Sequence, residues 1–342
     1  MLAVVKEKPG PGFTLKEVDV PIPKEDEVLV KVKSVGLCGS DIPIFRGIRE
    51  VPYPHIPGHE FSGVIVNKGK QVSKFQEGDQ VVAGLVVHCG ECIYCKQGLE
   101  SLCDHLYEIG IHVDGAFAEY VVAPEKTLHT LPEMLTFNQG ASIDPIASAY
   151  RPVRKSQITS EDVVVIFGPG PIGLYAAQIA RVEGAKKLIV VGTKGDEERL
   201  DLAEKFGADV TINSAEEDPV QCIHDCTQGE MADVVIEATG VPAVVEPCLK
   251  SVKKNGRITF IGIFHSPVEQ ISLTDIVRKE LNIQGSLCYT WKDFEACIHL
   301  VSSGRVRVEE LITHEFSLTE MANVLELAYN RKAIKIIVHP ET

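Results

Sequence analysis

The stretch that decides the fold reads Val163-Val164-Val165-Ile166-Phe167-Gly168-Pro169-Gly170-Pro171-Ile172-Gly173. Its first five residues form a continuous apolar run, which predicts a parallel strand buried on both faces. The next six carry the pattern Gly-x-Gly-x-x-Gly, and a helical pattern follows to about Glu183. In this context the glycines permit a tight turn, close approach of backbone amides to a pyrophosphate and close packing of helix on strand. The stretch therefore predicts a dinucleotide-binding site, with an ordinary glycine-rich turn as the alternative.

Downstream segments repeat the alternation of strand and helix. Apolar runs at 188–191, 209–212, 234–236 and 257–261 predict strands, and helical patterns such as 200–206 separate them. This alternation favours right-handed crossovers and a doubly wound sheet. We therefore predict a Rossmann dinucleotide-binding domain over residues 148–286.

The residues on either side of this domain follow a different pattern. Short apolar runs bounded by Gly, Asp and Asn predict strands near 28–33, 63–66, 80–83 and 118–122, as in a β-barrel. The alternating run at 334–338 predicts a last strand that returns to this barrel. A chain of 342 residues also exceeds the usual size of a single core. We therefore predict an α/β plus β protein in which residues 1–147 and 287–342 form a β-barrel domain, the dinucleotide domain is inserted, and the active site lies in the cleft between them.

Composition and charge exclude several classes of function. The chain has 48 acidic and 34 basic residues and a net charge of -14, which argues against sequence-independent binding to nucleic acid or to an anionic membrane. No apolar run reaches the roughly 18 to 20 residues of a membrane span, and the start of the chain lacks a signal-peptide pattern. We expect a soluble cytoplasmic protein that acts on a small molecule.

A short lobe at about 88–104 holds four of the ten cysteines. Cys89, Cys92, Cys95 and Cys103 are separated by two, two and seven residues, which lets four thiolates surround one zinc ion tetrahedrally. Such a closed site stabilises structure and leaves no position for a substrate. Reduced core cysteines and a nucleic-acid-binding zinc ribbon are the alternatives, but ribbons place two Cys-x2-Cys pairs roughly 15 to 20 residues apart.

A second set of metal donors lies between residues 37 and 60. Cys38, His59 and Glu60 offer a thiolate, an imidazole and a carboxylate, which together can bind a divalent transition metal. Taken singly, Cys38 could be a buried apolar thiol and His59 a hydrogen-bonded core histidine. The combination favours a metal site.

From about Lys24 to its end the chain resembles the zinc-dependent medium-chain alcohol and polyol dehydrogenases, which include sorbitol, butanediol, threonine and galactitol-phosphate dehydrogenases. The resemblance rests on Cys38-Gly39-Ser40-Asp41, Gly58-His59-Glu60, the four-cysteine lobe and the glycine motif, in the family's order. It implies a GroES-like β-barrel catalytic domain with an inserted Rossmann domain, one catalytic and one structural zinc ion, and a homodimer or homotetramer. It also implies reversible oxidation of a secondary alcohol of a polyol, diol or related small hydroxy compound to a ketone by NAD(P).

The resemblance assigns ligands to the catalytic zinc. Cys38 and His59 would bind the ion, and Glu60 would bind it directly or through water. Asp144, just before the dinucleotide domain, would be a further ligand or hold a bound water. A helix cap is the alternative for Asp144.

The resemblance also suggests a path for the substrate proton. Ser40 would accept the proton, and Asp41 would orient the far nitrogen of His59. Many relatives carry a histidine three residues after the serine, but this chain has Pro43, which cannot carry a proton. His55 is a candidate for the exit because it is close in sequence.

Cofactor contacts are expected around the glycine motif and the end of the second predicted strand. An acidic residue about 20 residues after the glycines would bond the ribose of NAD. This chain has Lys194 there, whose charge suits the 2'-phosphate of NADP. The preference for NADP(H) over NAD(H) is slight, because Asp196 or Glu197 could still bind the ribose and Lys194 could be a solvated turn residue. The predicted cofactor-binding residues are Gly168, Gly170, Pro171, Ile172, Gly173, Thr193, Lys194, Arg199 and Thr239.

The sequence leaves alternatives for both the substrate and the function. Sorbitol dehydrogenases present an Arg-Tyr pair where this chain has Cys288-Tyr289, so a sugar phosphate, butanediol or threonine is also conceivable. Phe45 and Phe117 either line the substrate pocket or belong to the core. The alternative function is a non-catalytic dinucleotide sensor or structural protein that keeps the fold. A zinc-free quinone reductase is a weaker alternative, since it would not use Cys38 and His59.

Overall fold

The computed structural model describes residues 1–269 and 271–341, which form two compact units. One unit contains residues 1–144 and 290–342, and the other contains residues 145–289. The sequence-based boundaries are residues 147 and 287. Among the described helices, none combines the length and the apolar character that a membrane span requires.

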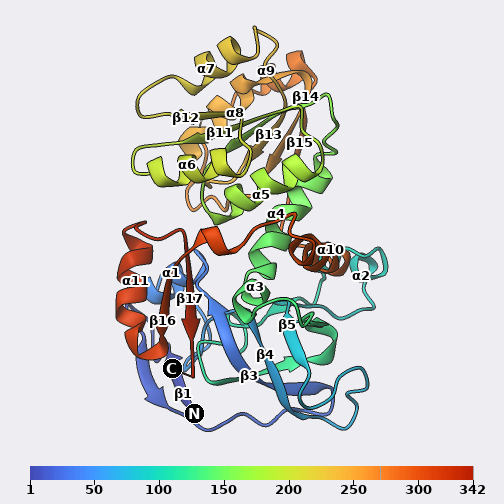
Figure 1. Cartoon of the computed structure of the whole chain (residues 1–342), viewed down its shortest axis with the longest axis vertical. Helices are drawn as coiled ribbons and strands as arrows, with labels where there is room; N and C mark the ends of the chain where they lie inside the picture. Colours follow the sequence, from blue (N-terminus) through green and yellow to red (C-terminus); the bar gives the residue numbers. More distant parts are fainter. Residues whose placement is uncertain (270, 342) are drawn as a thin grey trace. The chain divides into compact units, whose positions relative to one another are not determined.

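The second unit is a parallel sheet of six strands with helices on both faces. Its elements, entered through α4 (Ile143–Lys155), are β10 (Val163–Phe167), α5 (Pro171–Val182), β11 (Lys187–Gly192), α6 (Glu197–Lys205), β12 (Val210–Asn213), α7 (Pro219–Cys226), β13 (Ala232–Glu237), α8 (Val245–Ser251), β14 (Val252–Phe260), α9 (Leu273–Lys279) and β15 (Asn282–Gly285). Helices α5 and α6 pack together on one face, and α7 and α8 pack together on the other (Figure 1).

The order of these strands locates a ligand site. They are arranged β12-β11-β10-β13-β14-β15, so the apolar strand β10 lies at the centre, between β11 and β13. Its side chains from Val164 to Ile166 are fully buried, as expected for a strand covered on both faces. The strand order reverses between β10 and β13, and ligands bind such sheets at the carboxyl ends of the strands beside this reversal.

The first unit is built around a seven-stranded sheet. Its path is β16-β17-β3-β4-β5-β9, and β8 also pairs with β3. The last strand of the chain pairs with β3, as the sequence predicts. The elements of the unit are β1 (Leu2–Val5), β2 (Thr14–Glu17), β3 (Glu27–Gly36), α1 (Asp41–Arg46), β4 (Glu60–Lys68), β5 (Gln80–Ala83), β6 (Val86–Val87), α2 (Ile93–Lys96), β7 (Tyr107–Glu108), β8 (Tyr120–Pro124), β9 (Leu128–Thr130), α3 (Phe137–Ala141), α10 (Trp291–Ser302), β16 (Ile312–Ser317), α11 (Met321–Tyr329) and β17 (Lys335–His339).

Two aromatic residues that the sequence placed either in a pocket or in the core lie in or against the core of this unit. Phe117 is fully buried in the main apolar cluster, and Phe45 packs against that cluster. The ring of Phe45 meets that of Phe13 edge to face, with 5.3 Å between the ring centroids. Edge-to-face contact is a favoured arrangement of aromatic rings, so the pair of Phe13 and Phe45 stabilises the unit.

Candidate active site

Three of the predicted metal donors lie together in the first unit. Cys38 follows β3, His59 precedes β4, and Glu60 begins β4. The antiparallel pairing of β3 with β4 sets Glu60 opposite Gly36, where any side chain would overlap the Glu60 carboxylate. One ligand atom from each donor lies within 4.8 Å of the other two. A thiolate, an imidazole and a carboxylate at this spacing fit a divalent transition metal.

The charges around His59 also fit a metal ion. Burial alone would lower the pKa of His59, but the Cys38 side chain and two nearby carboxylates, Asp41 and Asp144, raise it well above its ordinary value. Burial raises the pKa of Asp41, whose Oδ2 accepts a hydrogen bond from the Cys38 amide at 2.9 Å. Among the described residues, His59 Nδ1 and Asp41 Oδ1 have no hydrogen-bond partner, and they lie 3.9 Å apart. A metal ion on the other ring nitrogen would fix a proton on Nδ1 and give it Asp41 as its acceptor.

Glu60 has a partner that the sequence analysis missed. Its Oε2 forms an ion pair with Lys335 Nζ, which also donates a hydrogen bond to the Leu37 carbonyl oxygen at 3.1 Å. The Glu60 and Lys335 side chains are only 3% and 2% exposed, so water does not screen the pair. The signal in the sequence is a lysine that begins a buried apolar strand, because lysines are almost never fully buried unless they are paired.

Asp144 lies near the three donors but outside the group that they form. It is buried, its Oδ2 accepts a hydrogen bond from the Leu85 amide at 3.3 Å, and its charge contributes to the raised pKa of His59. It also stands in the first turn of α4, where the helix dipole favours a negative charge. The structure thus brings Asp144 within electrostatic range of His59 without adding it to the group of donors.

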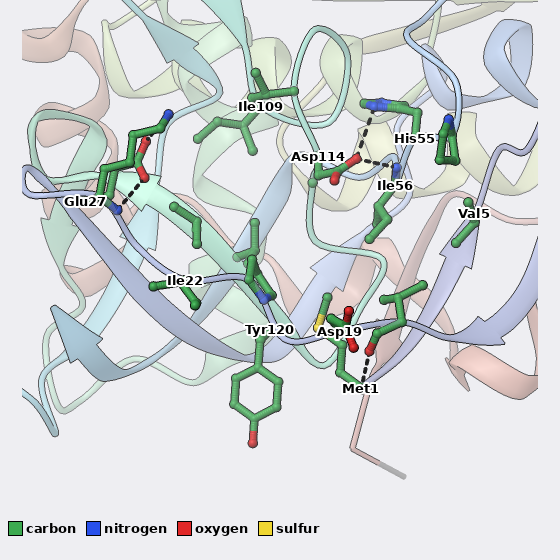
Figure 2. Close-up of a pocket in the computed structure, with 18 of the residues that line it drawn as sticks. Met1, Val5, Asp19, Ile22, Glu27, His55, Ile56, Ile109, Asp114 and Tyr120 are labelled. Atoms are coloured by element: carbon green, nitrogen blue, oxygen red, sulfur yellow. Dashed lines mark hydrogen bonds and ion pairs between the residues drawn. The ribbon is translucent and has the colours of Figure 1, made fainter. Parts of the chain in front are cut away.

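The two residues expected to move the proton lie in different local environments. Ser40 stands at the amino end of α1, half-buried, and its hydroxyl makes no capping bond to the described residues. His55 is buried elsewhere, with Nε2 3.0 Å from the Gly110 carbonyl oxygen and Nδ1 3.5 Å from Asp114 Oδ1. Figure 2 shows the His55 ring and the Ile56 amide directed at Asp114. These three residues line a cavity of about 670 Å³. His55 therefore holds the loop at 110–114. Its place at the end of the proton path stays a prediction.

The four cysteines of the lobe gather around one point. All four sulfur atoms lie within 4.8 Å of one another, and the Sγ atoms of Cys89 and Cys95 are 3.9 Å apart. Two thiolates on a tetrahedral zinc ion lie about 3.8 Å apart, so the spacing fits zinc. Amide hydrogen bonds from residues 95 and 104 lower the pKa of Cys92 to about 6, whereas burial raises that of Cys95 to about 12. Amides directed at sulfur are what a set of thiolates requires.

The glycine motif forms a compact loop between β10 and α5. Gly168 has a φ of 101°, and a Cβ there would lie 2.7 Å from Thr239 Cγ2. A side chain at Gly173 would overlap the Gly168 carbonyl oxygen. The atom nearest to a Cβ at Gly170 would be Arg199 Nη1, 3.9 Å away, so the backbone there is open to a ligand. The amino end of α5 and this arginine suit a pyrophosphate.

The turn after β11 leaves one cation exposed. Thr193 and Lys194 are exposed, whereas Asp196 is buried, and its Oδ2 accepts a hydrogen bond from the Thr193 amide at 3.1 Å. Its Oδ1 also lies 3.8 Å from Arg199 Nε. Glu197 accepts a hydrogen bond from an amide of the same turn at 3.1 Å. Both acidic residues therefore stabilise the turn itself.

Comparisons with known proteins cover nearly the whole chain. A family model described as a zinc-binding dehydrogenase matches residues 171–303, and one described as an alcohol dehydrogenase GroES-like domain matches residues 24–133. A sorbitol dehydrogenase of Halalkalibacterium halodurans is 35% identical over 99% of both chains. A D-arabitol-phosphate dehydrogenase of Enterococcus avium is 35% identical over 99% of this chain and 97% of its own. A zinc-binding dehydrogenase of Sinorhizobium meliloti, solved with NADP bound, superposes with a TM-score of 0.93 at 32% identity and 99% coverage of both chains.

Proposed function

We propose a substrate class and roles for the site residues of this chain. The chain belongs to the zinc-dependent medium-chain alcohol and polyol dehydrogenase family, as both family models and full-length relatives show. The chain is accordingly an oxidoreductase that transfers hydride between a secondary alcohol and NAD(P). The comparisons also confirm the predicted GroES-like domain and Rossmann domain. The substrate that we propose is a polyol, a diol or a related small hydroxy compound, which becomes a ketone.

The proposal depends on one observation, the convergence of the half-buried Cys38 with the buried His59 and Glu60. A zinc ion held there by Cys38 and His59 would supply Lewis-acid chemistry, which lowers the pKa of a substrate hydroxyl. Ser40, two residues from Cys38, would relay the hydroxyl proton, since its Oγ can accept that proton while its own hydroxyl proton passes to a ribose hydroxyl of the bound cofactor. Asp41 orients the His59 ring, and the four-cysteine lobe holds a second, structural zinc ion.

We infer a preference for NADP(H) from the turn after β11. Asp196 and Glu197 bind amides of that turn, and Lys194 is the exposed charge next to Thr193. Replacing Lys194 with Ala should raise KM for NADP by about tenfold, as the loss of one charged contact would, and leave KM for NAD unchanged. Lys186, an exposed lysine that precedes β11, provides the matched control. Equal effects on both cofactors would refute the inferred preference.

We also propose that the chain forms a homo-oligomer and acts in the cytoplasm. The oligomer is supported by exposed apolar side chains at the edge of the parallel sheet, on α9, β15 and the residues after it: Leu273, Val277, Ile283 and Leu287. Exposed apolar residues beside an edge strand are typical of surfaces that pair with another chain. Light scattering of the Val277→Glu variant should show smaller particles than the wild type, and an unchanged mass would contradict this surface.

The reaction is tested by metal analysis and turnover together. The wild-type protein should contain two zinc ions and oxidise members of a panel of polyols, diols and sugar phosphates. Cys38→Ala and His59→Ala should each lose one zinc ion and almost all activity, whereas Cys222→Ala, in neither metal group, should lose neither. Full turnover in either variant of the donor group would refute the zinc mechanism. Binding of NADPH without turnover of any alcohol would instead favour the alternative function, a non-catalytic dinucleotide sensor.

A further inference from the structure

A buried carboxylate at the end of β13 has no role in the reaction described above. Glu237 is the last residue of β13, is fully buried, and lies opposite Phe167 in the pairing of β13 with β10. Gly168 follows Phe167, so Glu237 stands beside the first glycine of the motif. A negative charge so close to the site of an anionic pyrophosphate is unexpected, since like charges repel each other.

One oxygen of Glu237 fixes the turn that follows the strand. Its Oε1 accepts hydrogen bonds from the Thr239 amide at 2.6 Å, from the Gly240 amide at 2.9 Å and from the Thr239 hydroxyl. Three donors to one carboxylate stabilise its charge. Because both Thr239 donors point at Glu237, the part of Thr239 turned toward the glycine motif is its methyl group, which packs against Gly168.

The other oxygen of Glu237 lowers the stability of the fold. Oε2 is buried and has no hydrogen-bond partner among the described residues. It faces the loop after β14, where a Cβ on Gly262 would lie 2.6 Å from it. A buried charged acceptor without a partner reduces stability. A residue that lowers stability while it organises a binding loop is typical of a residue retained for function.

We propose that Glu237 is a positioning residue for the dinucleotide, which holds the Thr239 turn against Gly168 and so sets the shape of the pyrophosphate loop. The role rests on the proposed function, because it concerns the same cofactor. It acts through contacts within the second unit alone. It therefore predicts an effect on cofactor affinity that is independent of zinc.

The experiment measures calorimetric dissociation constants for NADH and NADPH on the zinc-loaded, full-length protein, together with melting temperatures without cofactor. Glu237→Gln keeps the shape and removes the charge, so Kd should rise by about tenfold or more, as for the loss of a charge-assisted hydrogen bond. Its melting temperature should stay equal or increase, because the unpartnered charge is gone. Asp233→Asn is the matched control. Asp233 is an acid near the other end of the same strand, where it accepts the Val163 amide at 2.8 Å, and its replacement should leave Kd within about twofold of the wild type.

Thr239→Val supplies a second, independent variant. It keeps the branched shape against Gly168 but removes the hydroxyl donor, so Kd should rise less than in Glu237→Gln. The double variant should bind about as weakly as Glu237→Gln alone, because both changes break the same contact.

An unchanged Kd in Glu237→Gln would overturn the role, and so would a lower melting temperature with normal affinity, since that result assigns Glu237 to stability alone. If Glu237→Gln does not fold, Thr239→Val decides, and normal affinity in that variant overturns the role. Failure of the wild type to bind either dinucleotide would refute the proposed function instead.

Discussion

The buried pair of Lys335 with Glu60 allows a quantitative prediction. In Lys335→Met the aliphatic stem is conserved, but the Glu60 carboxylate stays buried without its cation. Removing one partner of a buried pair leaves an uncompensated charge and costs about 3 to 5 kcal/mol in the free energy of unfolding. Both side chains are at most 3% exposed, so solvent cannot relieve that cost, and we expect the full range. The loss should be smaller with zinc bound, because the released carboxylate can then bind the ion.

The assay follows urea unfolding by the fluorescence of Trp291. It is the only tryptophan, and it lies in the first unit, stacked on His129 with 3.7 Å between the ring centroids. Lys335→Met/Glu60→Gln should recover most of the loss, because it removes both charges. Lys332→Met is the control, since that lysine is exposed three positions earlier. A loss below about 1 kcal/mol in the metal-free Lys335→Met protein would show that the pair behaves like an exposed one and would refute the reasoning.

Three further predictions concern the same unit. Burial, helped by the charge of Lys74, lowers the pKa of His129 to about 3 in the folded protein. As the pH falls, this histidine therefore takes up its proton first in the unfolded chain. The free energy of unfolding should then decrease from pH 6.5 toward pH 3 by up to about 1.4 kcal/mol per pH unit. His129→Phe should keep the ring stack and flatten the dependence of the free energy of unfolding on pH between pH 6 and pH 4. A slope equal to that of the wild type would show that His129 does not cause the pH dependence. Cys92→Ser should lose the structural zinc ion and have a lower melting temperature. A variant that still contains two zinc ions would disprove this role of the cysteine lobe. Ser40→Ala should reduce kcat by about 10² to 10⁴ with normal zinc content and cofactor Kd, whereas an unchanged rate would place the proton acceptor elsewhere.

Much of the fold and of the metal chemistry could be predicted from local patterns. The apolar run before Gly168, the spacing of the four cysteines and the adjacent His59 and Glu60 each specify a structure over a few residues, where backbone geometry leaves few options. The return of the last strand could be predicted as well, because its alternating pattern fits the barrel and not the parallel sheet.

The contacts that were missed depend on distant residues or on the direction of one side chain. Lys335 lies 275 positions after Glu60, and a single sequence contains nothing that pairs them. His55 is as close in sequence to the zinc donors as a relay residue would be, yet its ring is directed toward Asp114. For Asp144 the residue type suggested a zinc ligand or a holder of bound water, which stays a prediction, whereas its hydrogen bond from the Leu85 amide could not be read from the sequence. Such outcomes are decided by tertiary packing, which periodicity does not describe.

The position of Lys335 in the chain also has a consequence for biosynthesis. A protein made from its amino end completes the metal donors and the whole Rossmann domain before the lysine that neutralises Glu60 has been added. During translation the half-built barrel therefore carries an uncompensated acidic residue at its metal site. An ion captured at that stage would meet the full negative charge of Glu60, and the arrival of the last strand would then bring Lys335 into competition with the ion for that carboxylate.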